Sequence, residues 1–166
     1  MDKPKENKIR TRVMEILRNH DQEARVIEAQ IAAEKEALEA DLEFILESAA
    51  FPSGQFSDAG VRVQSSPDPD GSLVRMVDKR EGRRQRANET IEKLEYQLAQ
   101  IKEVQSLVYT LDTRSKCVLL ALYYPYRSYD EAAEFLQIER TTVYRQREIA
   151  LNRLFARAEQ SEIFRK

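Results

Sequence analysis

The sequence predicts an all-α protein in which two long helices precede a C-terminal module of three shorter helices. Three observations predict this class. Apolar residues recur at three- and four-residue steps from about residue 9 to 49, they do so again from 77 to 108, and three shorter patterns of the same period fill residues 111–155. The expected organisation is a long helix in 1–50, a loop in 51–72, a second long helix in 73–110, the module in 111–158 and a tail in 159–166.

The first helix is predicted from a stripe without an intervening Gly or Pro. It consists of Val13, Leu17, Ala24, Ile27, Ile31, Leu38, Leu42 and Ile45. About forty residues at 1.5 Å each would make it roughly 60 Å long. One set of apolar positions in this stripe recurs at strict seven-residue steps. The adjacent set, also spaced by seven residues, loses its apolar character and is occupied by Glu34 and Asp41. This drift favours a nearly straight helix over a long two-stranded supercoil.

Residues 51–72 are rich in turn-forming residues and separate the two stripes. They include Pro52, Pro67, Pro69, Gly54, Gly60 and Gly71. A connection of this length exceeds the ordinary range, so it is either a disordered linker or an element that contacts a partner.

The second long helix carries a narrow apolar stripe of its own. Its members are Val77, Ala87, Ile91, Leu94, Leu98, Ile101 and Val108. Such a stripe needs a partner, and the first helix, folded back as an antiparallel hairpin, is the expected one. Packing of two hairpins as a four-helix bundle would give a homodimer or higher homo-oligomer. The sequence leaves pairing within and between chains open.

A dense basic cluster precedes the regular part of this stripe. It consists of Lys79, Arg80, Arg83, Arg84 and Arg86. Arginines and lysines at this density could bind phosphate or an acidic protein. A charged, fraying helix start near Gly82 is the interpretation that we favour.

The module has the spacing of a helix-turn-helix. A helix-turn-helix needs a small residue where its two helices cross, a tight turn four residues later and a branched apolar residue six residues beyond the turn. Ala133, Gln137 and Val143 occupy these three positions in turn. Ala132, Leu136 and Ile138 fill the inward positions around them. This spacing points to DNA.

The boundaries of the module support the same interpretation. Pro125 cannot continue the preceding helix. Ser128 and Glu131 have the spacing of a capping box, which predicts a new helix near Tyr129. Two departures from the usual pattern are Gln137, where Gly or Asn takes a left-handed turn more easily, and Glu139, where Ser or Thr caps better.

Residues 111–155 resemble the fourth conserved region of bacterial housekeeping-type sigma factors, which reads the upstream promoter element. The match runs without a gap from Ser128 to Leu151 and includes Asp130, Glu131, Ile138, Arg140, Val143 and Ala150. The preceding helix matches at Leu111, Arg114, Val118, Leu119 and Tyr123. In layout, the whole chain is similar to small phage and prophage regulators of the RinA and ArpU kind. This resemblance implies an activator of late or structural genes that acts with host RNA polymerase.

Candidate DNA contacts follow from the helical wheel and from the resemblance. With Val143 buried, the start of its helix directs Thr141, Thr142, Tyr144 and Arg145 toward base edges. The resemblance places contacts from Arg140 to Arg145. Candidate phosphate contacts are Arg127, Ser128, Arg147 and Arg153.

Charge is distributed unevenly around a net value of −2. Residues 1–50 hold 8 Lys and Arg against 12 Asp and Glu, whereas residues 111–166 hold 10 against 8. The basic half therefore contains the module, as phosphate binding requires. The excess is small, so we expect more than one module per DNA complex.

Several classes of protein are excluded by what the sequence lacks. Cys117 is the only cysteine and lies on an apolar helical face, so no disulfide can form within the chain. No apolar run is long enough to span a membrane, and residues 1–10 do not form a signal peptide, which predicts a cytoplasmic protein of a bacterial host. Motifs for catalysis, a cofactor or a metal are absent, so we expect no enzyme.

Two alternatives to a transcription regulator stay open. A small terminase subunit for phage DNA packaging also joins a helix-turn-helix to an oligomerising helical region. An interaction protein could instead bind RNA polymerase or a sigma factor. No segment resembles the aromatic-rich sigma region that melts promoters, so the chain is not expected to be a complete sigma factor.

Overall fold

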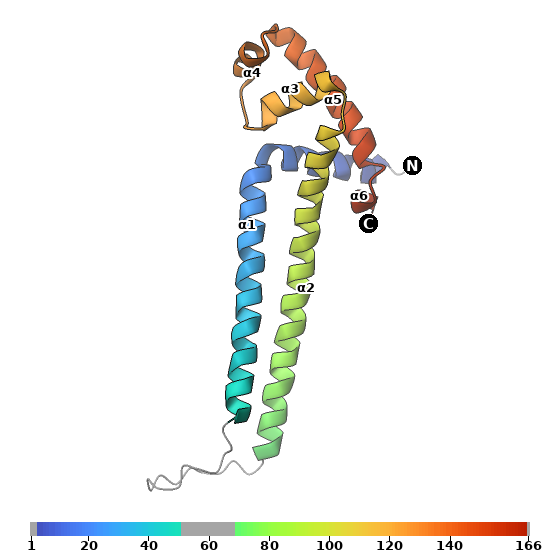
Figure 1. The fold of residues 1–166 in the computed structure, drawn as a ribbon. Helices are drawn as coiled ribbons and strands as arrows, with labels where there is room; N and C mark the ends of the chain where they lie inside the picture. Colours follow the sequence, from blue (N-terminus) through green and yellow to red (C-terminus); the bar gives the residue numbers. More distant parts are fainter. Residues whose placement is uncertain (1–2, 51–68, 166) are drawn as a thin grey trace. The chain divides into compact units, whose positions relative to one another are not determined.

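The computed structural model describes the backbone of residues 3–50 and 69–165 and the side chains of residues 7–41 and 78–165. Every regular element in these ranges is a helix, which confirms the predicted all-α class (Figure 1). The helices are α1 (Lys3–Ala50), α2 (Pro69–Tyr109), α3 (Thr113–Tyr123), α4 (Tyr129–Leu136), α5 (Arg140–Ala158) and α6 (Glu162–Arg165). No described helix is both long enough and apolar enough to cross a membrane.

The chain forms two compact units. Unit 1 combines residues 1–27 with residues 96–166, and unit 2 contains residues 28–95. The predicted module at 111–158 is therefore part of a larger unit, which also includes the first part of α1 and the last part of α2.

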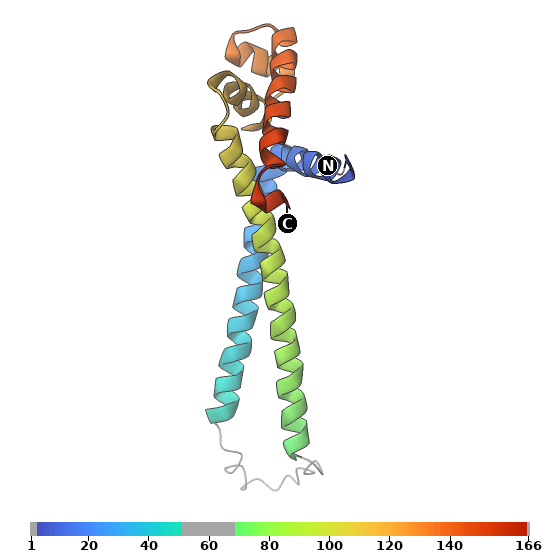
Figure 2. The same cartoon turned by 90° about the vertical axis from the view of Figure 1, so that its right-hand side faces the viewer.

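Unit 2 is an antiparallel hairpin of α1 and α2, which run side by side in both views (Figures 1 and 2). Lys35 Nζ lies 3.2 Å from Glu95 Oε1, and Arg83 Nη1 lies 3.5 Å from Asp41 Oδ1. Both ion pairs are largely exposed and stabilise little. The buried side chain of Ile91 belongs to the apolar stripe that holds the pair together. The predicted hairpin is confirmed, and it forms within one chain.

Three boundaries differ from the predicted ones. Helix α2 begins at Pro69, because a proline at the first position of a helix lacks an N–H that would have no partner there anyway. Gly82 lies inside α2, so the interpretation of this region as a helix start is wrong. The predicted tail contains α6. Residues 51–68 of the predicted loop lie outside the described residues.

Helix α1 bends within unit 1, which contradicts the predicted straight helix (Figure 1). Arg12 Nη2 donates a hydrogen bond of 2.5 Å to Glu23 Oε1. Eleven residues of a straight helix would separate their backbones by about 16 Å along the axis, which is more than these two side chains can span. On this bent part, Val13, Ile16 and Leu17 are fully buried.

The core of unit 1 lies where α3, α4 and α5 pack against one another. Its buried apolar side chains include Leu119 and Leu122 from α3, Ala132 from α4, and Val143 and Leu154 from α5. The C-terminal segment also attaches to α2. Tyr96 Oη donates 2.6 Å to the carbonyl oxygen of Ile163, and Ser161 Oγ donates 2.7 Å to Glu103 Oε1.

Candidate nucleic-acid interface

Helix α4 begins with the predicted capping box. The backbone N–H of Glu131 donates 3.3 Å to Ser128 Oγ, while Glu131 Oε2 accepts from Ser128 N at 2.8 Å and from Ser128 Oγ at 2.9 Å. These hydrogen bonds to Ser128 hold the pKa of the Glu131 carboxyl below its ordinary value. The capping box is confirmed. The Ser128 hydroxyl, a candidate phosphate contact, therefore serves to begin the helix.

The turn between α4 and α5 is a Schellman motif centred on Gln137. Gln137 adopts the left-handed conformation, with φ 54° and ψ 43°. Ile138 N donates 3.1 Å to Ala133 O, and Gln137 N donates 3.1 Å to Glu134 O. Glu139 precedes α5 without a side-chain capping bond. Both departures noted in the sequence thus fall where the helix-turn-helix spacing places them.

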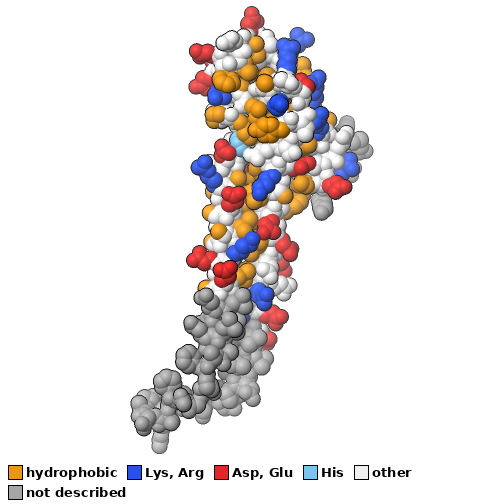
Figure 3. Space-filling view, viewed as in Figure 1, with side chains coloured by type: hydrophobic (Ala, Val, Ile, Leu, Met, Phe, Trp, Pro, Cys, Tyr) orange, Lys and Arg blue, Asp and Glu red, His pale blue; other side chains and the backbone are white. Residues whose placement is uncertain are grey.

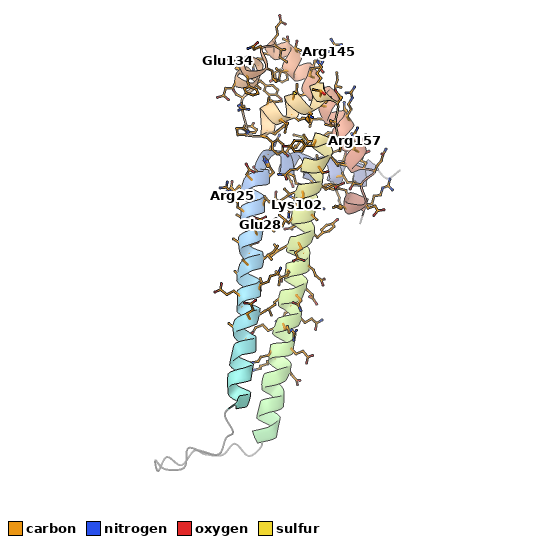
Figure 4. The ribbon with its side chains drawn as sticks, in the orientation of Figure 1. Arg25, Glu28, Lys102, Glu134, Arg145 and Arg157 are labelled. Atoms are coloured by element: carbon orange, nitrogen blue, oxygen red, sulfur yellow. The ribbon has the colours of Figure 1, made fainter. Side chains whose placement is uncertain are left out.

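Helix α5 has one buried and one exposed face, as the wheel predicts. Val143, Ala150 and Leu154 are fully buried, whereas Thr141 and Arg145 are exposed. Arg145 extends away from α3 and α4 (Figure 4). It has no hydrogen-bond or ion-pair partner among the described side chains, so all its N–H donors are available.

The other candidate base contacts are partly engaged within the protein. The ring of Tyr144 stacks on Tyr129, with centroids 3.9 Å apart and planes 7° apart. Arg140 Nη1 lies 3.2 Å from Asp130 Oδ1. Thr141 Oγ1 donates 3.3 Å to Glu139 Oε2. One face of Tyr144 is therefore covered.

Thr142, the remaining candidate base contact, is half-buried. It is the third residue of α5, and less of it is exposed than of Thr141. Arg145 is consequently the candidate base contact that would lose the fewest intramolecular interactions on binding DNA.

The candidate phosphate contacts Arg127 and Arg147 also hold the module together. Arg127 Nη1 donates 3.2 Å to the carbonyl oxygen of Ala121. Arg147 Nε donates 3.0 Å to Tyr123 Oη, and its Nη1 lies 2.8 Å from Glu148 Oε1. A guanidinium group has five N–H donors, so each arginine keeps donors beyond those used here.

Arg153, the last candidate phosphate contact, joins α5 to the start of α3. Its guanidinium donates to the Asp112 carboxylate and, at 3.2 Å, to Ser115 Oγ. Asp112 caps α3 by accepting from Ser115 N at 3.2 Å. These hydrogen bonds to Ser115, together with the charge of Arg153, lower the pKa of the Asp112 carboxyl. No sequence pattern predicts this role, because the contact joins residues 41 positions apart.

Charged side chains are unevenly distributed on the face of unit 1 that Figure 3 shows. Figure 3 shows Lys and Arg side chains gathered along the outer edge over α5 and acidic side chains around α4. The acidic residues in the first turn of α4 are Asp130 and Glu131. Polyanions would therefore be attracted to the α5 side of the module.

Other candidate chemistry can be placed as well. Cys117 is exposed, so its predicted position on an apolar face does not bury it. His20 is buried, and its ring lies 4.0 Å from that of Tyr124. Burial raises the pKa of the Tyr124 hydroxyl. In the part of the chain that the structure describes, no three His, Cys, Asp or Glu residues are grouped as metal ligands would be.

No family model, curated protein or solved structure matches this chain. The resemblance of residues 111–155 to a sigma region therefore rests on the residues that carry it, and what it implies remains a proposal.

Proposed function

We propose that this protein is a sequence-specific DNA-binding transcription regulator that inserts the first half of α5 into the major groove of double-stranded DNA. The observation that carries the proposal is the exposure of Arg145 and Thr141 on the face of α5 opposite the buried Val143. An arginine can bridge the two acceptors of a guanine, and a threonine can contact the methyl group of a thymine. Arg145 breaks no intramolecular bond when it does so.

Backbone phosphates would be bound around this helix. Arg127, Arg147 and Arg153 are held in place by contacts within the module. Preorganised side chains lose less entropy on binding than free ones. Their remaining N–H groups would set the register of α5 on the duplex without reading sequence.

Two modules would act together on one DNA site. The balance of 10 Lys and Arg against 8 Asp and Glu in residues 111–166 gives a single module little electrostatic affinity. Association of two chains through the long helices makes the second contact effectively intramolecular. Half-sites about one helical turn apart, or a multiple of that, are then expected.

Regulation would be activation of phage late or structural genes. The resemblance to a promoter-reading sigma region, without a melting region, favours a role beside host RNA polymerase that already carries a sigma factor. In a purified transcription assay the protein should raise output from a promoter next to its site and have no effect with core polymerase alone.

The DNA experiment starts by selecting bound fragments from the source genome, followed by affinity measurements on a preferred and a scrambled duplex. Arg145→Ala should weaken binding to the preferred duplex by about 1–3 kcal/mol and flatten discrimination at one base position. Arg25→Ala is the matched control. Arg25 is exposed on α1, so this substitution removes the same charge at a position away from α5 (Figure 4). It should bind as the unchanged protein does.

Two results would contradict the proposal. Failure to enrich any fragment would refute sequence-specific binding. A closed ring that ignores polymerase and stimulates DNA cleavage by a large terminase subunit would replace regulation with DNA packaging.

A further inference from the structure

A cavity of about 400 Å³ lies in unit 1 beside the starts of α4 and α5. Its lining includes four arginines and three tyrosines, with Arg18 from α1 joining residues of the C-terminal module. This volume falls within the range of sites for small ligands. The lining shares Arg127, Ser128, Arg140 and Arg147 with the candidate DNA contacts, but Arg18 and Tyr126 are not among those contacts.

The charges around the cavity are not balanced. Arg140 is paired with Asp130 at 3.2 Å, and Arg147 with Glu148 at 2.8 Å. Arg18 and Arg127 have no carboxylate within ion-pair distance among the described residues. Two positive charges are therefore uncompensated.

Glu131, whose carboxyl is influenced by the charge of Arg127, does not remove this imbalance. The charge of Arg127 contributes to the lowered pKa of Glu131, but the Glu131 carboxylate is bound by Ser128 in the capping box. Arg127 instead donates to a backbone carbonyl and lies with its guanidinium 4.6 Å from the ring centroid of Phe135.

A phosphate monoester fits these charges better than a carboxylate does. It carries about −1.5 to −2 at pH 7, whereas a carboxylate carries one negative charge. Guanidinium groups bind phosphate oxygens in bidentate geometry. Two unpaired arginines facing one cavity therefore select for a dianion.

The tyrosines supply surfaces for a planar ring. Tyr126 lines the cavity and is 69% exposed, so most of its ring is uncovered. Aromatic rings and guanidinium planes both stack on nucleobases. The inner part of the cavity is recessed, since the Arg147 side chain is only 17% exposed and Tyr123 only 5%. A small ligand can enter such a recess.

We propose that this cavity binds a small phosphate-bearing ligand with a planar ring, of the nucleoside monophosphate class. Arg18 and Arg127 bind the phosphate, and Tyr126 stacks on the ring. The ligand also meets Arg140 at the first residue of α5, so its occupancy can alter the Arg140–Asp130 pair that joins α5 to α4. Binding of this ligand does not depend on the proposed DNA function.

The test is calorimetric titration of the full chain with AMP, GMP, inorganic phosphate and adenosine. AMP or GMP should bind saturably and at least about tenfold more tightly than adenosine, because charge-assisted hydrogen bonds to the phosphate are lost in the nucleoside. Arg18→Ala should weaken nucleotide binding about tenfold or more. Arg18 is exposed and has no partner among the described residues, so this change should leave the fold intact.

Two further variants separate the parts of the site. Tyr126→Ala should weaken AMP binding and leave that of inorganic phosphate unchanged. Arg25→Ala, which removes a charge from α1 outside the cavity lining, should bind AMP normally. The proposal is overturned if neither nucleotide binds saturably, or if Arg18→Ala and Arg25→Ala behave alike. It is also overturned if Arg18→Ala weakens only duplex DNA, which would make the cavity part of the DNA-binding surface.

Discussion

Replacing Gln137 by glycine should stabilise the protein. Gln137 has φ 54° and ψ 43°, a left-handed conformation that costs a residue with a Cβ atom roughly 1–2 kcal/mol. Its side chain is exposed and has no hydrogen-bond partner among the described residues, so little is lost with it. The two hydrogen bonds of the Schellman motif come from backbone atoms and persist.

The expected increase in the free energy of unfolding is smaller than the energetic cost of the left-handed conformation. Glycine lowers stability by about 0.5–1 kcal/mol through the greater freedom of the unfolded chain. The expected increase in the free energy of unfolding is therefore about 0.5–1 kcal/mol, and for a chain of this size Tm should rise by about 1–4 °C. Urea and thermal unfolding, followed by far-UV circular dichroism, measure both quantities.

Two control variants separate the effect of the left-handed backbone conformation from other effects of the substitution. Gln137→Ala keeps the Cβ atom, so it should give none of this gain. Gln97→Gly makes the same change at an exposed position inside α2, where glycine should destabilise by about 1 kcal/mol. A loss of stability in Gln137→Gly, or an equal gain in Gln137→Ala, would refute the strain argument.

Three further predictions concern the core, pH and the hairpin. Leu154 is fully buried in α5, so Leu154→Ala should lower the free energy of unfolding by about 2–5 kcal/mol in urea titrations, and an unchanged midpoint would contradict its place in the core. The pKa of Glu131 is lower in the folded protein than its ordinary value of 4.5, so its stabilising effect is present above that pH and is lost as pH falls through the folded-state pKa. Unfolding midpoints measured from pH 6 to 3 should thus decrease at the acidic end, and Glu131→Gln should reduce the slope. Ile31→Asp places a carboxylate without a partner on the buried stripe of α1, should cost several kcal/mol and should expose the hairpin to limited proteolysis, whereas protection equal to that of the unchanged protein would argue against the pairing.

The local features of the C-terminal module could be predicted from the sequence. Ser128 and Glu131 are three residues apart, and Gln137 lies in a turn between two periodic segments. Their hydrogen bonds join atoms of neighbouring residues, so short-range rules determine them. The buried face of α5 was likewise predictable from Val143, because helical periodicity needs only one known inward position.

Short-range sequence rules did not determine how the two long helices pair. Their stripes are compatible with pairing inside one chain or between two, and the contacts Lys35–Glu95 and Arg83–Asp41 place it within one chain. Ile16 is fully buried although the predicted stripe does not include it. In unit 1, α1 forms part of the same compact body as the C-terminal helices, so more than one stripe of its surface is covered.

The cavity required the tertiary structure most of all. Arg18 and Arg127 line the same cavity although they are more than a hundred residues apart in the chain. No sequence motif predicts that these two arginines lie near each other. In the sequence, each of them reads as an ordinary surface arginine. The sequence by itself determined where the module's helices begin, turn and face inward, because those features depend on near neighbours. Only the folding of the chain decided which distant charges share a site, because that depends on contacts for which spacing along the sequence contains no rule.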